Sequence, residues 1–174
     1  MQESAADLKC CSLFNGLNEQ ELVRLFDLVE SETFASGEDI LTQGRVYRSV
    51  WVILRGQCEV VRTNGHGTDQ QLAVLEQGGI FGEMSFLHEA PHSATVRALS
   101  EVEAIHFTPA SFEQLKQSDI SASLTITSNL VLLLSDRLRR MDAWICEVVE
   151  QSEDRQHRAE WREFQSKLYT DWSF

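Results

Sequence analysis

Seven short runs rich in β-branched and aromatic residues follow one another between residues 32 and 107. The runs are Glu32 to Phe34, Ile40 to Thr42, Val50 to Leu54, Cys58 to Arg62, Gln71 to Leu75, Ala94 to Ala98 and Val102 to Phe107. Turn residues rich in glycine and proline separate them. Strands this short and this regularly spaced are typical of an antiparallel sandwich or barrel and not of a parallel α/β sheet. We therefore expect a mainly β fold with flanking α-helices, built as an antiparallel sandwich or barrel.

Helix signals flank this β-rich region on both sides. Asn18 followed by Glu21 forms a capping box, which predicts the start of an N-terminal helix. The apolar face of that helix is expected at Leu22, Leu25, Phe26 and Val29. After the last β-rich run, Thr108 and Pro109 predict the N-cap and first residue of a short helix that ends near Lys116. The expected order is helix, barrel, short helix and long C-terminal helix.

The long helical pattern begins near Asp119 and carries a regular apolar stripe. Its residues are spaced by 3, 4, 3, 4 and 3 positions, at Val131, Leu134, Leu138, Met141, Ile145 and Val148. This spacing is the pattern of a helix that packs against a partner helix. We expect the stripe to join two copies of the chain as a homodimer. The alternative is that the stripe packs against the barrel of its own chain.

The charge of the chain limits its partners. The formal net charge is −12 and the pI is about 4.8, whereas binding to nucleic acid or an anionic membrane depends on clustered Lys and Arg. The first residues contain no signal-peptide pattern, and the most apolar run, Leu130 to Leu134, is too short to span a bilayer. We expect a cytoplasmic protein that binds neither nucleic acid nor membrane.

Motifs for catalysis and for metal binding are missing from the sequence. We find no P-loop, nucleophile elbow, zinc motif or paired-carboxylate constellation, so we expect no enzyme activity and no catalytic residue. Cysteines 10, 11, 58 and 146 have no CxxC spacing and are expected to be ordinary reduced thiols. His88 and His92 are four residues apart, but Pro91 breaks any helix that would bring them together as metal ligands.

The segment Phe81 to Val96 contains the residues with the clearest binding chemistry. A glycine that follows a strand and precedes a short helix leaves backbone N–H groups free to meet an anion, and Gly82 permits a close approach. Glu83 offers a carboxylate that can accept hydrogen bonds from a pair of hydroxyls, such as the edge of a ribose. Pro91 ends the short helix.

This segment resembles the phosphate-binding cassette of cyclic-nucleotide-binding domains. The similar residues are Phe-Gly-Glu-Met-Ser-Phe-Leu at 81–87 and Pro-His-Ser-Ala-Thr-Val at 91–96. Such domains occur in bacterial regulators of the catabolite-activator type, in protein kinase regulatory subunits and in nucleotide-gated channels. The likeness continues in Leu13-Phe14 with Gly16-Leu17, in Phe34 to Glu38 with Gln43-Gly44, and in Val52 to Gly56, so it covers about Leu13 to Lys116.

The resemblance implies that the β-rich region folds as an antiparallel β-barrel of the jelly-roll (double-stranded β-helix) type. It also implies a domain plan and a ligand, cAMP or cGMP, with no other cofactor. The plan is an N-terminal extension at 1–12, the barrel at 13–118, a long dimerisation helix at 119–150 and a tail at 151–174, for which a second short helix and a mobile segment are both open interpretations. The tail is too short for a helix-turn-helix domain, so we do not expect DNA binding. The implied ligand-binding residues are Gly82, Glu83, Met84, Ser85, His92, Ser93 and Ala94.

Within this set, the resemblance implies a role for each part of the cassette. Glu83 would bind the ribose 2′-hydroxyl. The backbone N–H groups of Gly82, Met84 and Ser85 would face the cyclic phosphate, and Ser93 would lie near the phosphate or the base.

The sequence departs from the family pattern at His92. Family members that bind a cyclic nucleotide usually have an arginine directly after the cassette proline, where its guanidinium pairs with the phosphate. A histidine is mostly neutral at pH 7, and losing a charge-assisted hydrogen bond weakens binding by roughly 1.5–3 kcal/mol. Arg97 lies in the following strand, where we expect it in a structural ion pair.

Two functions therefore stay open on the sequence. In the first, the chain is a regulatory module that binds a cyclic nucleotide or related anion and relays the signal through its C-terminal helix to a dimer or an unknown effector protein. In the second, it keeps the fold, has lost the ligand and acts as a structural or interaction protein.

Overall fold

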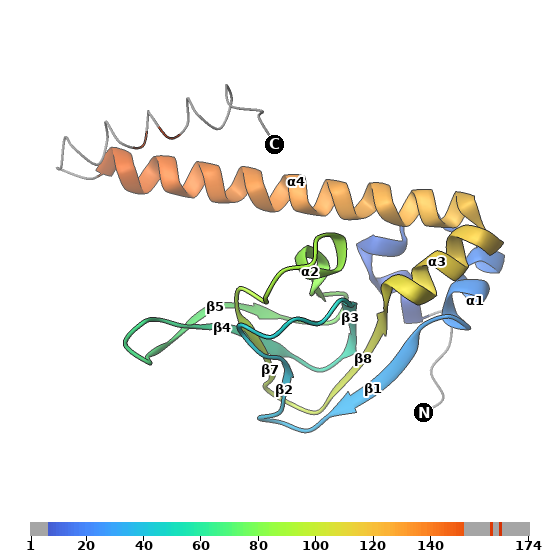
Figure 1. Cartoon of the computed structure of the whole chain (residues 1–174), viewed down its shortest axis with the longest axis horizontal. Helices are drawn as coiled ribbons and strands as arrows, with labels where there is room; N and C mark the ends of the chain where they lie inside the picture. Colours follow the sequence, from blue (N-terminus) through green and yellow to red (C-terminus); the bar gives the residue numbers. More distant parts are fainter. Residues whose placement is uncertain (1–6, 152–160, 162–163, 165–174) are drawn as a thin grey trace. The chain divides into compact units, whose positions relative to one another are not determined.

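The computed structural model describes residues 7–151, 161 and 164, and divides the chain into two compact units, residues 1–130 and 131–174. The first unit contains the whole β-sandwich, its flanking helices and the first turns of the long helix (Figure 1). The two units are described separately below. The tail from residue 152 onwards, for which a second helix was one of the interpretations, lies almost entirely outside the described residues.

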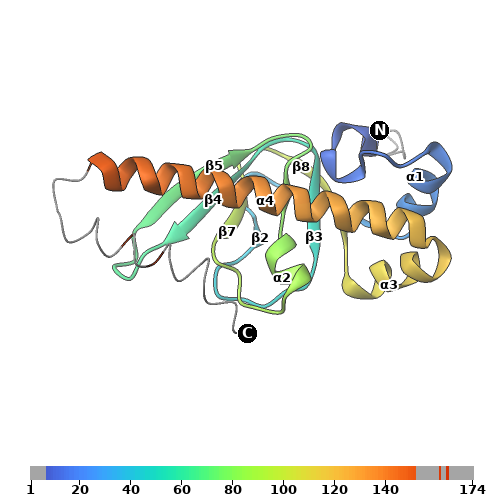
Figure 2. The same cartoon turned by 90° about the horizontal axis from the view of Figure 1, so that it is seen from above.

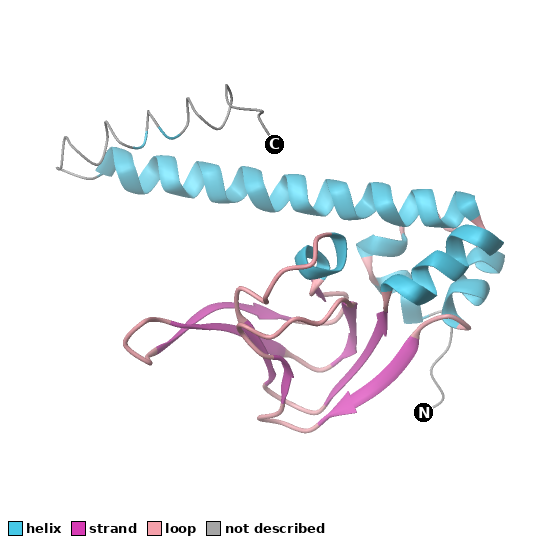
Figure 3. Cartoon of the chain, viewed as in Figure 1, coloured by secondary structure: helices cyan, strands magenta, loops and turns pink. Residues whose placement is uncertain are grey.

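Two four-stranded antiparallel sheets form the body of the first unit (Figure 3). The first sheet has the order β1 (Glu30–Phe34), β8 (Val102–Phe107), β3 (Val50–Arg55) and β6 (Ile80–Phe81). The second has the order β2 (Asp39–Leu41), β7 (Thr95–Ala98), β4 (Cys58–Thr63) and β5 (Asp69–Leu75). The expected antiparallel jelly-roll class is confirmed. The short strand β6 was not predicted, because two residues carry no periodicity.

The core between the sheets is apolar and built around Trp51. Its members are Leu41, Trp51, Ile53, Cys58, Phe81, Val96, Ala98, Val102 and Ala104. The indole ring of Trp51 packs on Phe81 and His106, and its Nε1–H donates to Ser49 Oγ at 2.9 Å. The buried indole thus keeps its one polar group satisfied, as buried tryptophans generally do. Burial raises the pKa of the Cys58 thiol to about 11, so Cys58 is an inert core residue.

Helices gather at one end of this sandwich (Figure 2). They are two 3-10 turns, η1 (Asp7–Cys10) and η2 (Ser12–Phe14), with α1 (Glu19–Phe26), α3 (Pro109–Ser118) and the start of α4 (Ile120–Gln151). A further short helix, α2 (Glu83–Leu87), follows β6. The turn η1 packs against β3, and Val50 and Val52 are therefore buried on the strand face opposite Trp51.

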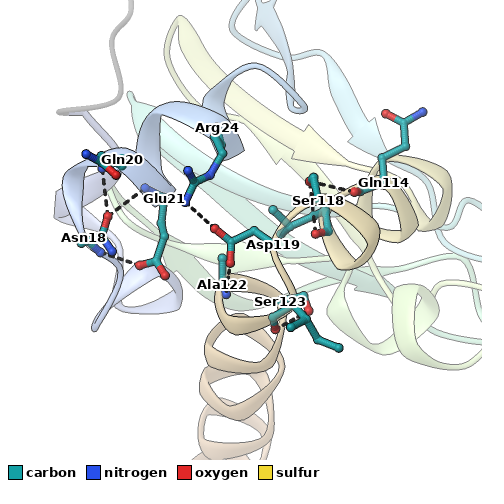
Figure 4. Close-up of polar contacts among 11 residues, drawn as sticks. Asn18, Gln20, Glu21, Arg24, Gln114, Ser118, Asp119, Ala122 and Ser123 are labelled. Atoms are coloured by element: carbon teal, nitrogen blue, oxygen red, sulfur yellow. Dashed lines mark hydrogen bonds and ion pairs between the residues drawn. The ribbon is translucent and has the colours of Figure 1, made fainter.

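The two predicted helix starts are confirmed by their caps. Asn18 Oδ1 accepts hydrogen bonds from the N–H groups of Gln20 and Glu21, and the Glu21 carboxylate accepts one from the N–H of Asn18 (Figure 4). Thr108 and Ser111 form the equivalent box at the start of α3, with Pro109 as first residue. The N-terminal helix is shorter than expected: it ends at Phe26, so Val29 is not part of its apolar face.

The first turns of α4 are bound firmly to the N-terminal region. Ala122, Ile126 and Leu130 are fully buried on one face of this part of the helix. Beside them, Asn129 Nδ2 donates to the carbonyl oxygens of Leu13 at 2.8 Å and Asn15 at 2.9 Å. Apolar burial and two hydrogen bonds from Asn129 therefore hold the first turns of α4 against the N-terminal region.

The predicted stripe lies farther along α4. Val131, Leu138, Met141 and Val148 are exposed, and Leu134 and Ile145 are partly buried. Two more exposed residues, Ile120 and Leu124, continue the same spacing toward the start of the helix through Thr127. Among the described residues, no helix is both long enough and apolar enough to cross a membrane.

Candidate functional site

The cassette begins where β6 ends, at a glycine in the left-handed region. Gly82 has φ 78° and turns the chain from Phe81 into α2. A Cβ at this position would lie 2.4 Å from the carbonyl oxygen of Ser49, so the turn requires glycine for both conformation and space. The Gly82 carbonyl accepts from the Phe86 N–H at 3.0 Å, which closes the single turn of α2.

Helix α2 buries two of the expected ligand-binding residues and exposes the third. Glu83 and Ser85 are 4% and 3% exposed, whereas the Met84 side chain is exposed. A buried carboxylate and a buried hydroxyl therefore stand two residues apart on one short helix. Only the backbone of Met84, and not its side chain, belongs to this buried group.

His92 is held in place by its backbone. Its N–H donates to the carbonyl of Arg45 at 2.8 Å, and its carbonyl accepts from the N–H of Gly44 at 2.9 Å. The loop between β2 and β3 is thus joined to the cassette, and this loop was not recognised as part of the site from the sequence. The Gln43-Gly44 turn was visible there, but nothing in it indicates its partner forty-eight residues later.

The imidazole of His92 packs inside the cassette. It is 6% exposed, its Nδ1 lies 3.0 Å from Ser85 Oγ, and its ring stacks on that of Tyr47 at 6.0 Å between centroids. Its Nε2 is buried and has no hydrogen-bond partner among the described residues. Burial lowers the pKa of His92 below its usual value, so the ring is neutral at pH 7.

The last two expected residues lie nearer the surface. Ser93 is exposed and Ala94 is half-buried. The next residue, Thr95, is buried, and its Oγ1 accepts from the Gln43 N–H at 3.0 Å. This contact is a second link between the cassette and the β2–β3 loop that sequence reasoning missed.

The same loop contains two arginines, and the guanidinium of one of them contacts the cassette. Arg48 donates to the Phe86 carbonyl at 3.2 Å, and its Nη1 lies 3.8 Å from the Glu89 carboxylate. The exposed Arg45 forms no ion pair within the described part of the chain. In a chain of net charge −12, these residues place local positive charge beside the segment expected to meet an anion.

Arg97 takes no part in this group. Its Nε lies 2.6 Å from Asp39, and its Nη1 lies 3.8 Å from Glu59 and 3.9 Å from Asp69. The hydrogen bond to Asp39 and the surrounding carboxylates raise the pKa of Arg97 further above its usual range. The expected structural ion pair is confirmed, and Arg97 cannot supply the charge that position 92 lacks.

Thr127 of α4 and the two histidines of the cassette segment differ in their surroundings. The Thr127 hydroxyl donates to the Ser123 carbonyl one turn earlier in α4, at 2.8 Å. His88 is exposed at the end of α2, while His92 is buried against Ser85. Across the residues that the structure describes, no three His, Cys, Asp or Glu side chains form a group that could hold a metal ion.

The family of this fold and cassette is shown by comparison with known proteins. The family profile described as "Cyclic nucleotide-binding domain" matches residues 31–119, just over half of the chain and including the entire cassette. The chain therefore belongs to the cyclic-nucleotide-binding domain family.

Individual relatives agree with this assignment. The cyclic AMP receptor protein of Thermus thermophilus is 30% identical over 135 residues, which are 78% of this chain and 61% of the relative. A cAMP-dependent protein kinase regulatory subunit of Blastocladiella emersonii is 28% identical over 103 residues, 59% of this chain and 26% of the relative. The crystal structure of the Thermus thermophilus catabolite activator protein superposes with a TM-score of 0.72 at 27% identity, over 79% of this chain and 62% of that one. The chain thus spans less than two thirds of the length of each.

Proposed function

We propose that this chain is a cytoplasmic, non-catalytic regulatory module that binds a cyclic nucleotide, cAMP or cGMP, at the Phe81–Val96 cassette. The observation that carries the proposal is the burial of Glu83 at the start of α2, directly after the left-handed Gly82. A buried carboxylate at this point offers acceptors for ribose hydroxyls, which is the role that the family resemblance implies. The printed names of two relatives, a cyclic AMP receptor and a cAMP-dependent kinase subunit, support a cyclic nucleotide as the ligand class.

The ligand's phosphate would meet the backbone N–H groups of Gly82, Met84 and Ser85, together with the ring of His92. Arg45 and Arg48 add positive charge from the neighbouring loop and offset part of the loss of the usual arginine. Because His92 is neutral at pH 7, we expect weaker binding than an arginine would give, by roughly 10- to 150-fold. The proposed affinity is therefore low, and binding should be measured up to about millimolar ligand.

The output of the module would pass through α4. Its exposed stripe from Ile120 to Val148 fits a second copy of the same helix, because it repeats at heptad spacing. A ligand can shift such a dimer only if it binds two helix arrangements with different affinity. We propose that the cassette and α4 are coupled in this way, in a homodimer or with an effector protein.

Isothermal titration calorimetry with cAMP and cGMP tests the proposal. We expect saturable heat with at least one nucleotide, and an at least tenfold weaker Kd in the Glu83→Gln variant, which loses a charged acceptor. The matched control is Glu101→Gln, since Glu101 is an exposed carboxylate on the turn between β7 and β8. The absence of heat with either nucleotide in the folded protein would refute the ligand and favour the ligand-free interaction role.

A further inference from the structure

His92 has a buried ring nitrogen that the fold itself leaves unsatisfied. Nδ1 lies 3.0 Å from the Ser85 hydroxyl, but Nε2 has no hydrogen-bond partner in the described part of the chain, although the residue is only 6% exposed. Buried polar atoms without partners are rare, because each loses its hydrogen bonds to water without replacement. The structure therefore contains an unused hydrogen-bonding atom inside the cassette.

The Ser85 hydroxyl decides what this nitrogen can do. A serine hydroxyl can donate or accept, so it can pair with Nδ1 in either protonation state of the ring. In the neutral tautomer in which Ser85 donates to Nδ1, the single ring proton is on Nε2. When the ring is protonated, Nδ1–H donates to Ser85 Oγ and Nε2–H remains a donor. In this tautomer and in the protonated ring, Nε2–H would point a hydrogen toward an acceptor such as a phosphate oxygen.

Charged groups of both signs belong to the elements around His92. The cassette contributes Glu83, His88 and Glu89, and the β2–β3 loop contributes Arg45, Tyr47 and Arg48. The carboxylates favour a protonated ring and the guanidinium groups oppose it. Since Arg48 is paired with Glu89, its effect on His92 is partly neutralised. The opposing charges largely offset each other, so an added anion would shift the His92 imidazole toward its protonated state.

We propose that His92 makes ligand binding proton-linked, so that a cyclic phosphate bound at Nε2 draws a proton onto the ring and holds it there as an ion pair. This inference rests on the proposed function. Tyr47 stacks on the His92 ring and is itself 54% exposed. The module would then respond to a cyclic nucleotide more strongly in a more acidic cell.

The direction of the pH dependence follows from the two states of the ring. In the free protein burial lowers the pKa of His92, and a bound phosphate anion raises this pKa again. Binding therefore takes up a proton between the two pKa values, and the affinity rises as the pH falls through that window. Because the phosphate exchanges a neutral for a charge-assisted hydrogen bond, we expect Kd to fall by about 5- to 10-fold between about pH 8 and about pH 5.8.

Calorimetry with cAMP and cGMP at these two pH values tests the inference, with three variants. His92→Arg should bind more tightly and with no pH dependence, because its charge is permanent. His92→Gln should bind weakly and also without pH dependence. His88→Gln, the matched control at an exposed histidine of the same segment, should keep the full pH dependence. An NMR titration of the His92 ring should show its pKa rising when the ligand is added.

The outcomes separate this inference from the proposed function. If nucleotide binds but Kd is the same at both pH values, or if the pH dependence is lost in His88→Gln, proton linkage at His92 is wrong and the binding function stands. If His92→Arg binds a nucleotide but the natural chain shows no binding even at the lower pH, proton linkage at His92 is also wrong. If neither the natural chain nor His92→Arg binds at either pH, the proposed function fails.

Discussion

Arg24 of α1 donates a hydrogen bond to Asp119, the residue between α3 and α4, with 2.5 Å between Nη2 and Oδ2 (Figure 4). The other carboxylate oxygen of Asp119 accepts from the N–H of Ala122 at 3.0 Å and so caps α4. One carboxylate thus joins the N-terminal helix to the start of the helix through which we propose the module signals.

Replacing Asp119 by alanine should lower the free energy of unfolding by about 1–2 kcal/mol, because it removes an N-cap and an ion pair together. Asp119→Asn should have a smaller effect, since an asparagine can still cap the helix. Urea denaturation gives both values. The control is Asp136→Ala, which removes the exposed ion pair between Asp136 and Arg140, four residues apart in α4. This change should alter the free energy of unfolding by at most about 0.5 kcal/mol. If Asp119→Ala and Asp136→Ala lower the free energy of unfolding equally, the contacts of Asp119 do not stabilise the fold more than an exposed ion pair does.

Asp119 should also contribute to stability in a pH-dependent way. The hydrogen bond from the Ala122 N–H, and then Arg24, hold the pKa of the Asp119 carboxyl below its usual value. A carboxyl whose pKa is lower in the folded state stabilises the fold above its unfolded pKa of about 4, and this contribution is lost as the pH falls through the folded pKa. The stability difference between the natural chain and Asp119→Asn should therefore shrink below about pH 4. A difference that stays constant down to the acid transition would contradict this account.

Gly82 should be irreplaceable for the shape of the cassette. An alanine there would need a φ near +78°, and its Cβ would meet the Ser49 carbonyl oxygen at 2.4 Å. Strain of this kind destabilises a fold by about 1–3 kcal/mol and would displace the start of α2, so binding should be lost as well. Gly65→Ala is the matched control, because no atom lies within 4 Å of a Cβ at that turn. Thermal unfolding and calorimetry of both variants test the prediction, and a Gly82→Ala protein that is as stable as Gly65→Ala would refute it.

The elements that could be predicted from the sequence are those with local signals. The capping boxes at Asn18 and Thr108 depend on residues three positions apart, and the strands are marked by their own composition and turns. Trp51 lies in the core, as expected for an aromatic residue inside an apolar strand. Local chemistry acts within a few residues, so one sequence contains enough information to read it.

The contacts that define the candidate site could not be read in the same way. The direction of the Arg97 side chain depends on the register of β7 against its neighbours. Its hydrogen bond to Asp39 forms next to a register shift between β2 and β7, which only the folded sheet reveals. The bridge from Gly44 and Arg45 to His92 joins segments far apart in the chain. No periodicity or spacing encodes such a contact. The sequence therefore identified the cassette, whereas the loop that completes it needed the structure.

The stripe on α4 makes a prediction about the orientation of the proposed dimer. With Val131 and Leu134 at the first and fourth heptad positions, Arg137 falls at the seventh position and Asp142 at the fifth position of the next heptad. In a parallel pair of helices these two positions of opposite chains lie side by side, and in an antiparallel pair they do not. A parallel dimer would thus form two symmetric Arg137–Asp142 ion pairs between chains.

A charge exchange tests this arrangement. Arg137→Glu alone should weaken dimerisation several-fold, because it places two like charges opposite each other, and Arg137→Glu with Asp142→Arg should restore it. Analytical ultracentrifugation over a range of protein concentrations gives the dissociation constants. Arg139→Glu is the control, because Arg139 is exposed at a heptad position away from the stripe and should leave dimerisation nearly unchanged. If Arg137→Glu weakens the dimer and the double exchange does not restore it, the two residues do not pair between chains and the parallel register is wrong. If the natural chain is monomeric at all concentrations, the stripe binds an effector protein and not a second copy.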